Sequence, residues 1–234
     1  MKKSTAFVSA ILSLIPMSQP LLFKTGVALS SSTVILSFSG RANAGDNSYY
    51  FNSAYDKAEN GDYYGAISDY TKAIEINPND GDAYYNRGNA KRKLKDDYGA
   101  ISDYIKAIKI NPSFEYAYYN RGNAKSDLKD YYGAISDYTK AIEINPQYSI
   151  AYNNRGFIKF KIKDYYGAIS DYTKAIEIDP VYALAYTNRS ESKENIGDIK
   201  GACADAKKAF SLGDEDANKS WIKENCKVFK SYLK

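Results

Sequence analysis

The polar residues that could do chemistry in this sequence recur with a single spacing. Arginine, aspartate and asparagine each return every 34 residues along much of the chain. The three rows are Arg87, Arg121, Arg155 and Arg189; Asp69, Asp103, Asp137, Asp171 and Asp205; and Asn52, Asn86, Asn120, Asn154 and Asn188. A side-chain amide both donates and accepts hydrogen bonds, so the asparagines could hold a peptide backbone without reading its sequence. The rows could therefore bind a partner, or they could hold the fold together.

Candidates for catalysis are missing from the sequence. It contains no histidine, which removes the commonest general base and metal ligand. It also has no glycine-rich phosphate loop, no nucleophile beside such a base, no C-x-x-C pair and no cluster of metal ligands. The sequence therefore predicts a protein that is not an enzyme and that uses neither a cofactor nor a metal.

The net charge of +4 belongs to the first 44 residues. Four basic residues and no acid lie there, so the basic and acidic residues of the remaining chain balance. Affinity for nucleic acid depends on concentrated lysine and arginine. Because the body of the chain is neutral, we expect no nucleic-acid partner.

Residues 1–44 have the features of an export signal. Two lysines precede apolar runs at 6–15 and 27–38, and a small-x-small sequence ends at Ala44. Neither run reaches the roughly 18 to 20 apolar residues of a membrane-spanning helix. We therefore expect cleavage after Ala44 and export to a periplasm or a lumenal compartment. The alternatives are an uncleaved membrane anchor, which would make the membrane a partner, and an organelle presequence.

One block of sequence sets the period of the chain. The six residues Gly65–Tyr70 return unchanged three times at steps of 34, and a worn copy begins at Gly201. Apolar residues in and after the block recur at three- and four-residue intervals, which places them on one face of a helix. An aspartate precedes each block where it can cap the helix, and Asn-Pro or Asp-Pro ends the helix in four copies. Another helix-length segment comes before each block, so the sequence predicts consecutive helix pairs.

Aromatic, glycine, alanine and proline residues at fixed offsets within this period resemble those of the tetratricopeptide repeat. One copy carries Tyr118, Gly122, Ala134, Tyr138, Ala141 and Pro146. The resemblance implies an all-α fold, namely a right-handed superhelical solenoid of five helix-turn-helix units with a C-terminal capping helix. The expected units are 47–80, 81–114, 115–148, 149–182 and the degenerate 183–216, and the capping helix is expected at 217–234. The Tyr-x-Asn-Arg-Gly openings are also similar to those of exported cyanobacterial proteins of this family.

The resemblance also implies a function and a binding surface. Tetratricopeptide stacks use the concave surface of their first helices to bind peptides or partner proteins, which would make this chain a non-catalytic scaffold or adaptor. The residues expected on that surface are Tyr85, Asn86, Asn89, Tyr119, Asn120, Asn123, Asn153, Asn154, Phe157, Thr187 and Asn188. Asparagine at the recurring offset is also simply common in the family, so a structural role stays open. The subtype that grips chaperone tails is not matched, because uncharged residues occupy its cationic positions.

A second function stays open beside the adaptor. The chain could be a structural, self-associating or membrane-tethered repeat protein that makes its contacts through the outer surfaces of the stack.

Two rows of charged residues depart from the family pattern. Arginine stands where the family has a packed leucine, and a charge at a packed position needs a partner. We expect the aspartate row to supply it, either within a unit (Arg87 with Asp103) or between units (Arg87 with Asp69). The alternative is that the arginines bind a ligand carboxylate. Lysine follows one turn later, where we expect its stem to cover apolar surface and its ammonium to lie in water.

Both cysteines fall near the C-terminus. Cys203 occupies an offset that is isoleucine in four other copies, and Cys226 shares one helix face with Trp221, which we expect to plug the core. If the chain is exported to an oxidising compartment, a disulfide between the two cysteines is expected. The alternative is two buried free thiols that act as small apolar side chains.

Overall fold

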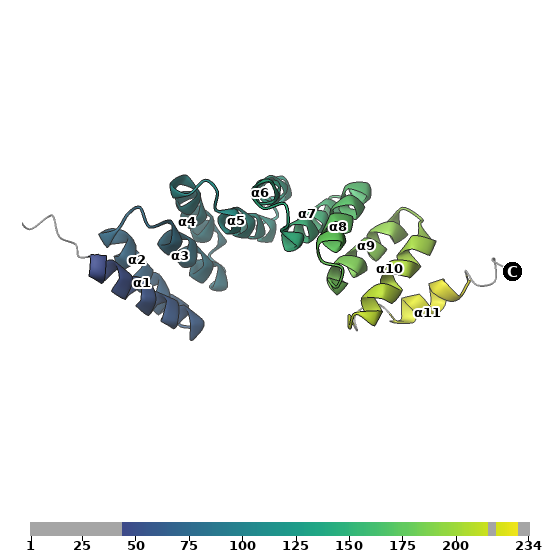
Figure 1. Ribbon diagram of the computed structural model, residues 1–234, viewed down its shortest axis with the longest axis horizontal. Helices are drawn as coiled ribbons and strands as arrows, with labels where there is room; N and C mark the ends of the chain where they lie inside the picture. The colour runs from purple at the N-terminus through teal and green to yellow at the C-terminus, as the bar shows by residue number, and fades with distance from the viewer. Residues whose placement is uncertain (1–43, 215–218, 229–234) are drawn as a thin grey trace, which may run out of the picture. The chain divides into compact units, whose positions relative to one another are not determined.

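The computed structural model describes residues 44–214 and 219–228, and these residues form eleven α-helices without a strand. The helices are α1 (Ala44–Glu59), α2 (Tyr63–Ile76), α3 (Gly81–Lys93), α4 (Asp97–Ile110), α5 (Glu115–Asp127), α6 (Tyr131–Ile144), α7 (Ser149–Lys161), α8 (Tyr165–Ile178), α9 (Ala183–Asn195), α10 (Ile199–Ser211) and α11 (Lys219–Val228). Each odd-numbered helix from α1 to α9 packs against the next even-numbered helix, and each pair packs against its neighbour (Figure 1). The predicted all-α solenoid of consecutive helix pairs is confirmed.

The core of each of the three middle units is a tyrosine set against a glycine. Tyr104, Tyr138 and Tyr172 of the second helices are almost fully buried. A Cβ atom built on Gly122 of α5 would lie 2.8 Å from the ring of Tyr138, and Gly88 and Gly156 stand in the same relation to their own tyrosines. Only glycine allows the first helix to approach the ring this closely, which explains why glycine recurs there.

Aspartates cap the second helices as predicted. Asp130 Oδ1, for example, accepts a hydrogen bond from the backbone N–H of Gly133 at 3.0 Å, and the other four capping aspartates do the same. A Cβ on Gly133 would lie 2.1 Å from Asp130 Oδ2. The repeated glycine therefore makes room for the capping carboxylate.

The turn inside each unit needs a left-handed residue. Gly61 and Gly197 supply it in the first and last units, with φ of +80° and +81°. The three middle units place a lysine there instead, with φ of 64° or 65°: Lys95, Lys129 and Lys163. This conformation costs an L-residue about 1 kcal/mol or more, so each middle unit tolerates a local strain that the end units avoid.

Helix α11 packs against α10 and is joined to it by a disulfide between Cys203 and Cys226, whose Cα atoms lie 5.6 Å apart. Both cysteines are buried. Trp221 is half-buried and not a core plug, because its indole Nε1 donates to Glu194 Oε1 at 2.7 Å. Residues 1–43, which hold nearly all of the predicted leader, and 229–234, which complete the predicted capping helix, lie outside the described residues.

Among the described helices, none is both long enough and apolar enough to cross a membrane. The described residues also contain no group of three acidic or cysteine side chains arranged to hold a metal ion.

Candidate binding surface on the first helices

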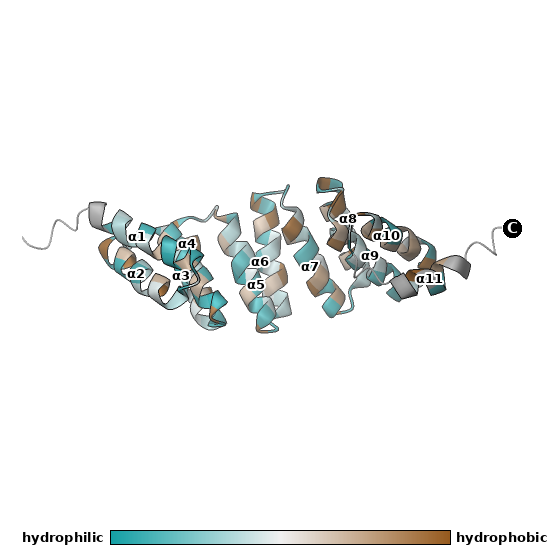
Figure 2. Ribbon diagram, turned by 90° about the horizontal axis from the view of Figure 1, so that it is seen from below, coloured by the Kyte–Doolittle hydropathy of each residue, from teal (hydrophilic) through white to brown (hydrophobic). Residues whose placement is uncertain are grey.

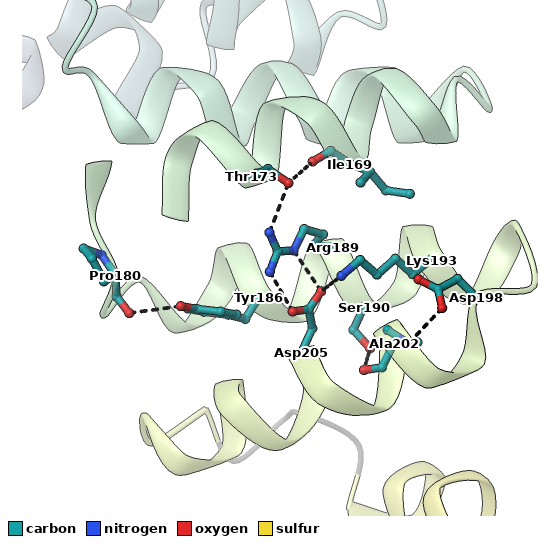
Figure 3. A network of polar contacts seen from close by, with 11 residues as sticks. Ile169, Thr173, Pro180, Tyr186, Arg189, Ser190, Lys193, Asp198, Ala202 and Asp205 are labelled. Carbon is teal, nitrogen blue, oxygen red and sulfur yellow. Dashed lines mark hydrogen bonds and ion pairs between the residues drawn. The ribbon is translucent and has the colours of Figure 1, made fainter. Parts of the chain in front are cut away.

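The arginine row is part of a repeated ionic network (Figure 3). Arg189 donates from Nε and Nη2 to the two carboxylate oxygens of Asp205, at 2.8 and 2.7 Å. Its Nη1 donates to Thr173 Oγ1 of the preceding unit at 3.0 Å. Lys193 Nζ reaches the same carboxylate at 2.7 Å. One aspartate is thus held by two cations, and one arginine joins two units.

The ion pairs of this network recur in the second, third and fourth units. Arg87, Arg121 and Arg155 pair with the aspartate of their own unit, which confirms the pairing within units and excludes the pairing of Arg87 with Asp69. The lysines one turn later also bind these aspartates, at 2.8 Å in each of the three units. The expectation that the lysine ammonium lies in water was therefore wrong, because Oδ2 of the buried carboxylate accepts from the lysine as well as from the arginine Nε.

The third unit lacks the link to its neighbour. Arg87, Arg155 and Arg189 donate from Nη1 to a threonine of the preceding unit. For Arg121 the corresponding residue is Ile105, which offers no hydroxyl. Arg121 keeps its two bonds to Asp137 but makes no bond to the unit before it within the described part of the chain.

The first unit builds the network without an arginine. Asp69 binds Lys57, Ser53 at 2.8 Å and Lys72 at 3.0 Å. The hydrogen bond from Lys57, followed by those from Ser53 and Lys72, outweighs the cost of burial and lowers the pKa of the Asp69 carboxyl to about 2. Asp69 is therefore ionised at any ordinary pH.

The asparagine row ties one first helix to the next. Asn120 Nδ2 on α5 donates to Tyr85 Oη at 2.9 Å and to Asn89 Oδ1 at 3.0 Å, both on α3. Asn154 on α7 repeats this pattern with Tyr119 and Asn123 on α5, at 2.9 and 3.1 Å. These amides are engaged inside the protein, which favours the structural role for this part of the row.

Two residues expected on the surface are engaged by the stack in the fourth and fifth units. Asn153 is 2 % exposed and accepts a hydrogen bond from Asn188 Nδ2 at 3.0 Å, so the expectation that it faces a partner was wrong. The hydroxyl of Thr187 donates to Asp214 in the segment after α10. Two other units carry tyrosine at the offset of Asn153. The asparagine side chain is shorter than tyrosine and therefore lies between the packed helices.

Asn86 has an amide that no described residue binds. It would need the tyrosine and asparagine that Asn120 finds on its neighbour, but the first unit has Phe51 and Tyr55 at those offsets. Asn86 is half-buried. Asn52, which has no helix before it among the described residues, lines a pocket of about 590 Å³ beside Tyr49 and Ser53. No described residue binds the side-chain amide of either asparagine.

Apolar side chains are exposed at the beginning of three consecutive first helices. Tyr116, Ile150 and Leu184 occupy one offset and are 47 %, 45 % and 49 % exposed. Phe157, two turns along α7, is 40 % exposed, and Lys161 Nζ lies 4.8 Å from its ring centroid. The 34-residue spacing of Tyr116, Ile150 and Leu184 is visible in the sequence, but no partner contact was predicted for these residues.

Aromatic rings continue this surface between units. The ring of Tyr148 lies 5.6 Å from that of Tyr116 and 5.0 Å from that of Tyr119. Phe114 contacts Tyr85 in the same way at 4.7 Å. The sequence of α3 is largely hydrophilic, whereas that of α7 contains several hydrophobic residues (Figure 2). The row formed by Tyr116, Ile150 and Leu184 therefore extends from α5 to α9.

Comparisons with known proteins agree with this architecture. Residues 81–114, 115–148 and 149–182 match the model described as tetratricopeptide repeat, and residues 54–95 match a second one described as TPR repeat. The chain is a tetratricopeptide repeat protein. A search of curated proteins gave no match.

Solved structures with the same fold include two of the protein MamA. One is 25 % identical with a TM-score of 0.68, over 76 % of this chain and 97 % of that one. The other is 27 % identical with a TM-score of 0.66, over 70 % and 96 %. YrrB, described as a TPR protein with an unusual peptide-binding site, is 21 % identical with a TM-score of 0.64, over 79 % and 92 %, and shows the likeness of fold alone.

Proposed function

We propose that this chain is a non-catalytic adaptor that binds a peptide or a segment of a partner protein along its first helices. The observation that carries the proposal is the exposed row of Tyr116, Ile150 and Leu184, with Phe157 beside it. Exposed apolar side chains gathered on one surface mark interaction sites. A bound segment would cover them, and the free amide of Asn86 would take a backbone group of the same segment.

The hydrogen bonds inside the stack refine which asparagines take part. Asn120 and Asn154 donate to the preceding helix, so replacing them would loosen the stack as well as any binding. Asn52 and Asn86 have no such bonds. The proposal therefore assigns partner contact to these two asparagines and to the exposed apolar row.

Cross-linking capture from the chain's own compartment tests the proposal. We expect the triple variant Tyr116→Ser, Ile150→Ser and Leu184→Ser to lose most of the captured partner, because its targets are exposed and their loss leaves the core intact. The matched control is Tyr64→Ser with Tyr166→Ser, which changes exposed side chains on second helices. Equal capture by the triple variant and the control would contradict the proposal, provided that circular dichroism shows both to be folded.

We also assign the chain to an oxidising compartment outside the cytoplasm, reached through cleavage after Ala44. The features of residues 1–44 support this assignment, and so does the buried disulfide, since such bonds persist in oxidising compartments. N-terminal sequencing of the purified chain should begin at Gly45. An intact leader in the membrane fraction would instead favour the membrane-tethered alternative.

A further inference from the structure

Two tyrosines on consecutive first helices have a hydroxyl proton left to donate. Tyr85 on α3 and Tyr119 on α5 occupy the same offset, and we call them the tyrosine pair. Asn120 Nδ2 donates to Tyr85 Oη at 2.9 Å, and Asn154 Nδ2 donates to Tyr119 Oη at 2.9 Å. A hydroxyl oxygen that accepts from an amide keeps its own proton for another bond. Both tyrosines are half-buried, so a ligand on this surface can reach them.

The amide oxygens around the tyrosine pair are already engaged. Asn89 Oδ1 accepts from Tyr104 Oη at 2.8 Å, and Asn123 Oδ1 accepts from Tyr138 Oη at 2.7 Å. Asn120 Oδ1 accepts from Asn123 Nδ2 at 3.3 Å. This part of the surface therefore offers a ligand donors more than acceptors. A ligand that suits it brings carbonyl oxygens and few N–H groups of its own.

Aromatic rings surround the tyrosine pair. The ring of Phe114 lies 4.7 Å from that of Tyr85, and the ring of Tyr148 lies 5.0 Å from that of Tyr119. The exposed ring of Tyr116 connects these two contacts, at 6.5 Å from Phe114 and 5.6 Å from Tyr148. Surfaces lined with aromatic rings bind proline-rich segments in several classes of domain.

The spacing of the tyrosine pair selects the conformation of the ligand. Its members lie one unit apart on first helices that contact each other, and packed helices are about 8 to 10 Å apart. A polyproline II helix turns once in three residues and rises about 9 Å per turn, so its carbonyls point the same way at this spacing. In a β-strand the corresponding distance is about 7 Å. The carbonyls of an α-helix are bonded within the helix.

We propose that the first helices bind a proline-rich segment in the polyproline II conformation, with carbonyls three residues apart on the hydroxyls of Tyr85 and Tyr119. This inference rests on the proposed adaptor function and names the chemical class of its partner. Proline lacks a backbone N–H, so such a segment brings no donor that the surface would leave unpaired. Its fixed φ also reduces the conformational entropy that is lost on binding. Tyr116 lies one helical turn before Tyr119, where it would contact the proline rings.

Isothermal titration calorimetry of the full chain tests the proposal. The probe is a peptide of nine L-prolines, which is about 28 Å long and spans about three units. The control is the same peptide built from D-proline, whose helix has the opposite hand and the same composition. We expect saturable binding of the L-peptide. The D-peptide should bind at least about fivefold more weakly, because its carbonyls cannot reach both hydroxyls at once.

A double variant, Tyr85→Phe with Tyr119→Phe, tests the role of the hydroxyls because it keeps both rings. Its dissociation constant for the L-peptide should rise about tenfold or more, since two hydrogen bonds are lost. The matched control is Tyr84→Phe with Tyr118→Phe. It changes neighbouring tyrosines whose rings lie beside the arginines of the ionic network, and it should leave the dissociation constant unchanged. Far-UV circular dichroism shows whether each variant is folded.

Three results would overturn the proposal. They are an L-peptide that shows no saturable binding up to about 1 mM, a D-peptide that binds as tightly as the L-peptide, and a double variant that binds no more weakly than its matched control. Failure of this proposal is distinguishable from failure of the adaptor function. If the triple variant of the exposed row loses its captured partner while the L-peptide does not bind, the adaptor function stands and its partner belongs to another class.

Discussion

Two junctions in the stack differ by one side chain. Between the third and fourth units, Arg155 holds Asp171 and also donates to Thr139 Oγ1 at 3.0 Å. Between the second and third units, Arg121 holds Asp137 in the same way but faces Ile105. The ion pair is therefore a property of each unit, whereas the bond between units depends on the sequence of the neighbour.

Removing the aspartate that binds the arginine should lower the free energy of unfolding more than any other change proposed for these junctions. The loss should also differ between the two junctions. Asp137→Ala leaves the half-buried Arg121 and Lys125 without their shared partner, and we expect a loss of about 3 kcal/mol in the free energy of unfolding. Asp171→Ala should cost less, because Arg155 retains Thr139. Urea denaturation of both variants measures the difference, and a smaller loss for Asp137→Ala would contradict this account of the junctions.

The first unit offers a pH test of a network that has no arginine. The pKa of Asp69 is about 2 in the folded chain against about 3.8 for a free carboxyl. A lowered pKa stabilises the fold fully above pH 4, and this stabilisation is lost as the pH falls from about 4 to 2. Asp69→Asn should therefore lower the free energy of unfolding by about 2 kcal/mol at pH 6. The loss should vanish near pH 2, and a difference that stays constant with pH would be inconsistent with this origin.

Thr139→Ile should make the junction between the third and fourth units resemble the junction between the second and third. It removes the acceptor of Arg155 Nη1, and we expect the free energy of unfolding to fall by about 1 kcal/mol, the net contribution of a typical hydrogen bond. Hydrogen exchange should show the loss in α6 and α7 more than in α2 and α3. Thr71→Ile provides the control, because it removes the corresponding bond between the first and second units.

Ile105→Thr should add the bond that is missing between the second and third units. We expect the smallest change in the free energy of unfolding from this variant. A hydroxyl at this position would accept from Arg121 Nη1, and because Ile105 is exposed little apolar burial is lost. We expect a gain of up to about 1 kcal/mol. In Ile105→Val, which is also β-branched but has no hydroxyl, the gain should be absent.

Much of the fold follows from the sequence because contacts within a unit repeat with the unit. The cap of Asp130 on Gly133 and the pairing of Arg87 with Asp103 both join residues at short, fixed separations. The period that places one such pair places all of them. The third contact, from Lys91 to Asp103, was missed because it requires knowing that one carboxylate oxygen accepts from both the arginine and the lysine.

Contacts between units were harder to predict. Whether Asn120 faces a partner or Tyr85 depends on how far one unit is rotated on the next, and no residue within a single unit determines this rotation. The freedom of Asn86 is consistent with that contact, because Phe51 has no hydroxyl where later units have tyrosine and Tyr55 stands where they have asparagine. The exposed row of Tyr116, Ile150 and Leu184 was overlooked because its residue types differ from unit to unit.

Helices α2, α6 and α8 share all fourteen residues, and this identity has a consequence for how the chain folds. Three interchangeable helices allow stacks in which α8 takes the place of α6 and a unit is left out, and such stacks would bury many of the native contacts. Misassembly of this kind is a characteristic kinetic trap of repeat proteins. The first helices differ from one another, so they supply the information that separates the native order from the shifted ones. Their variation would therefore guide refolding as well as partner choice.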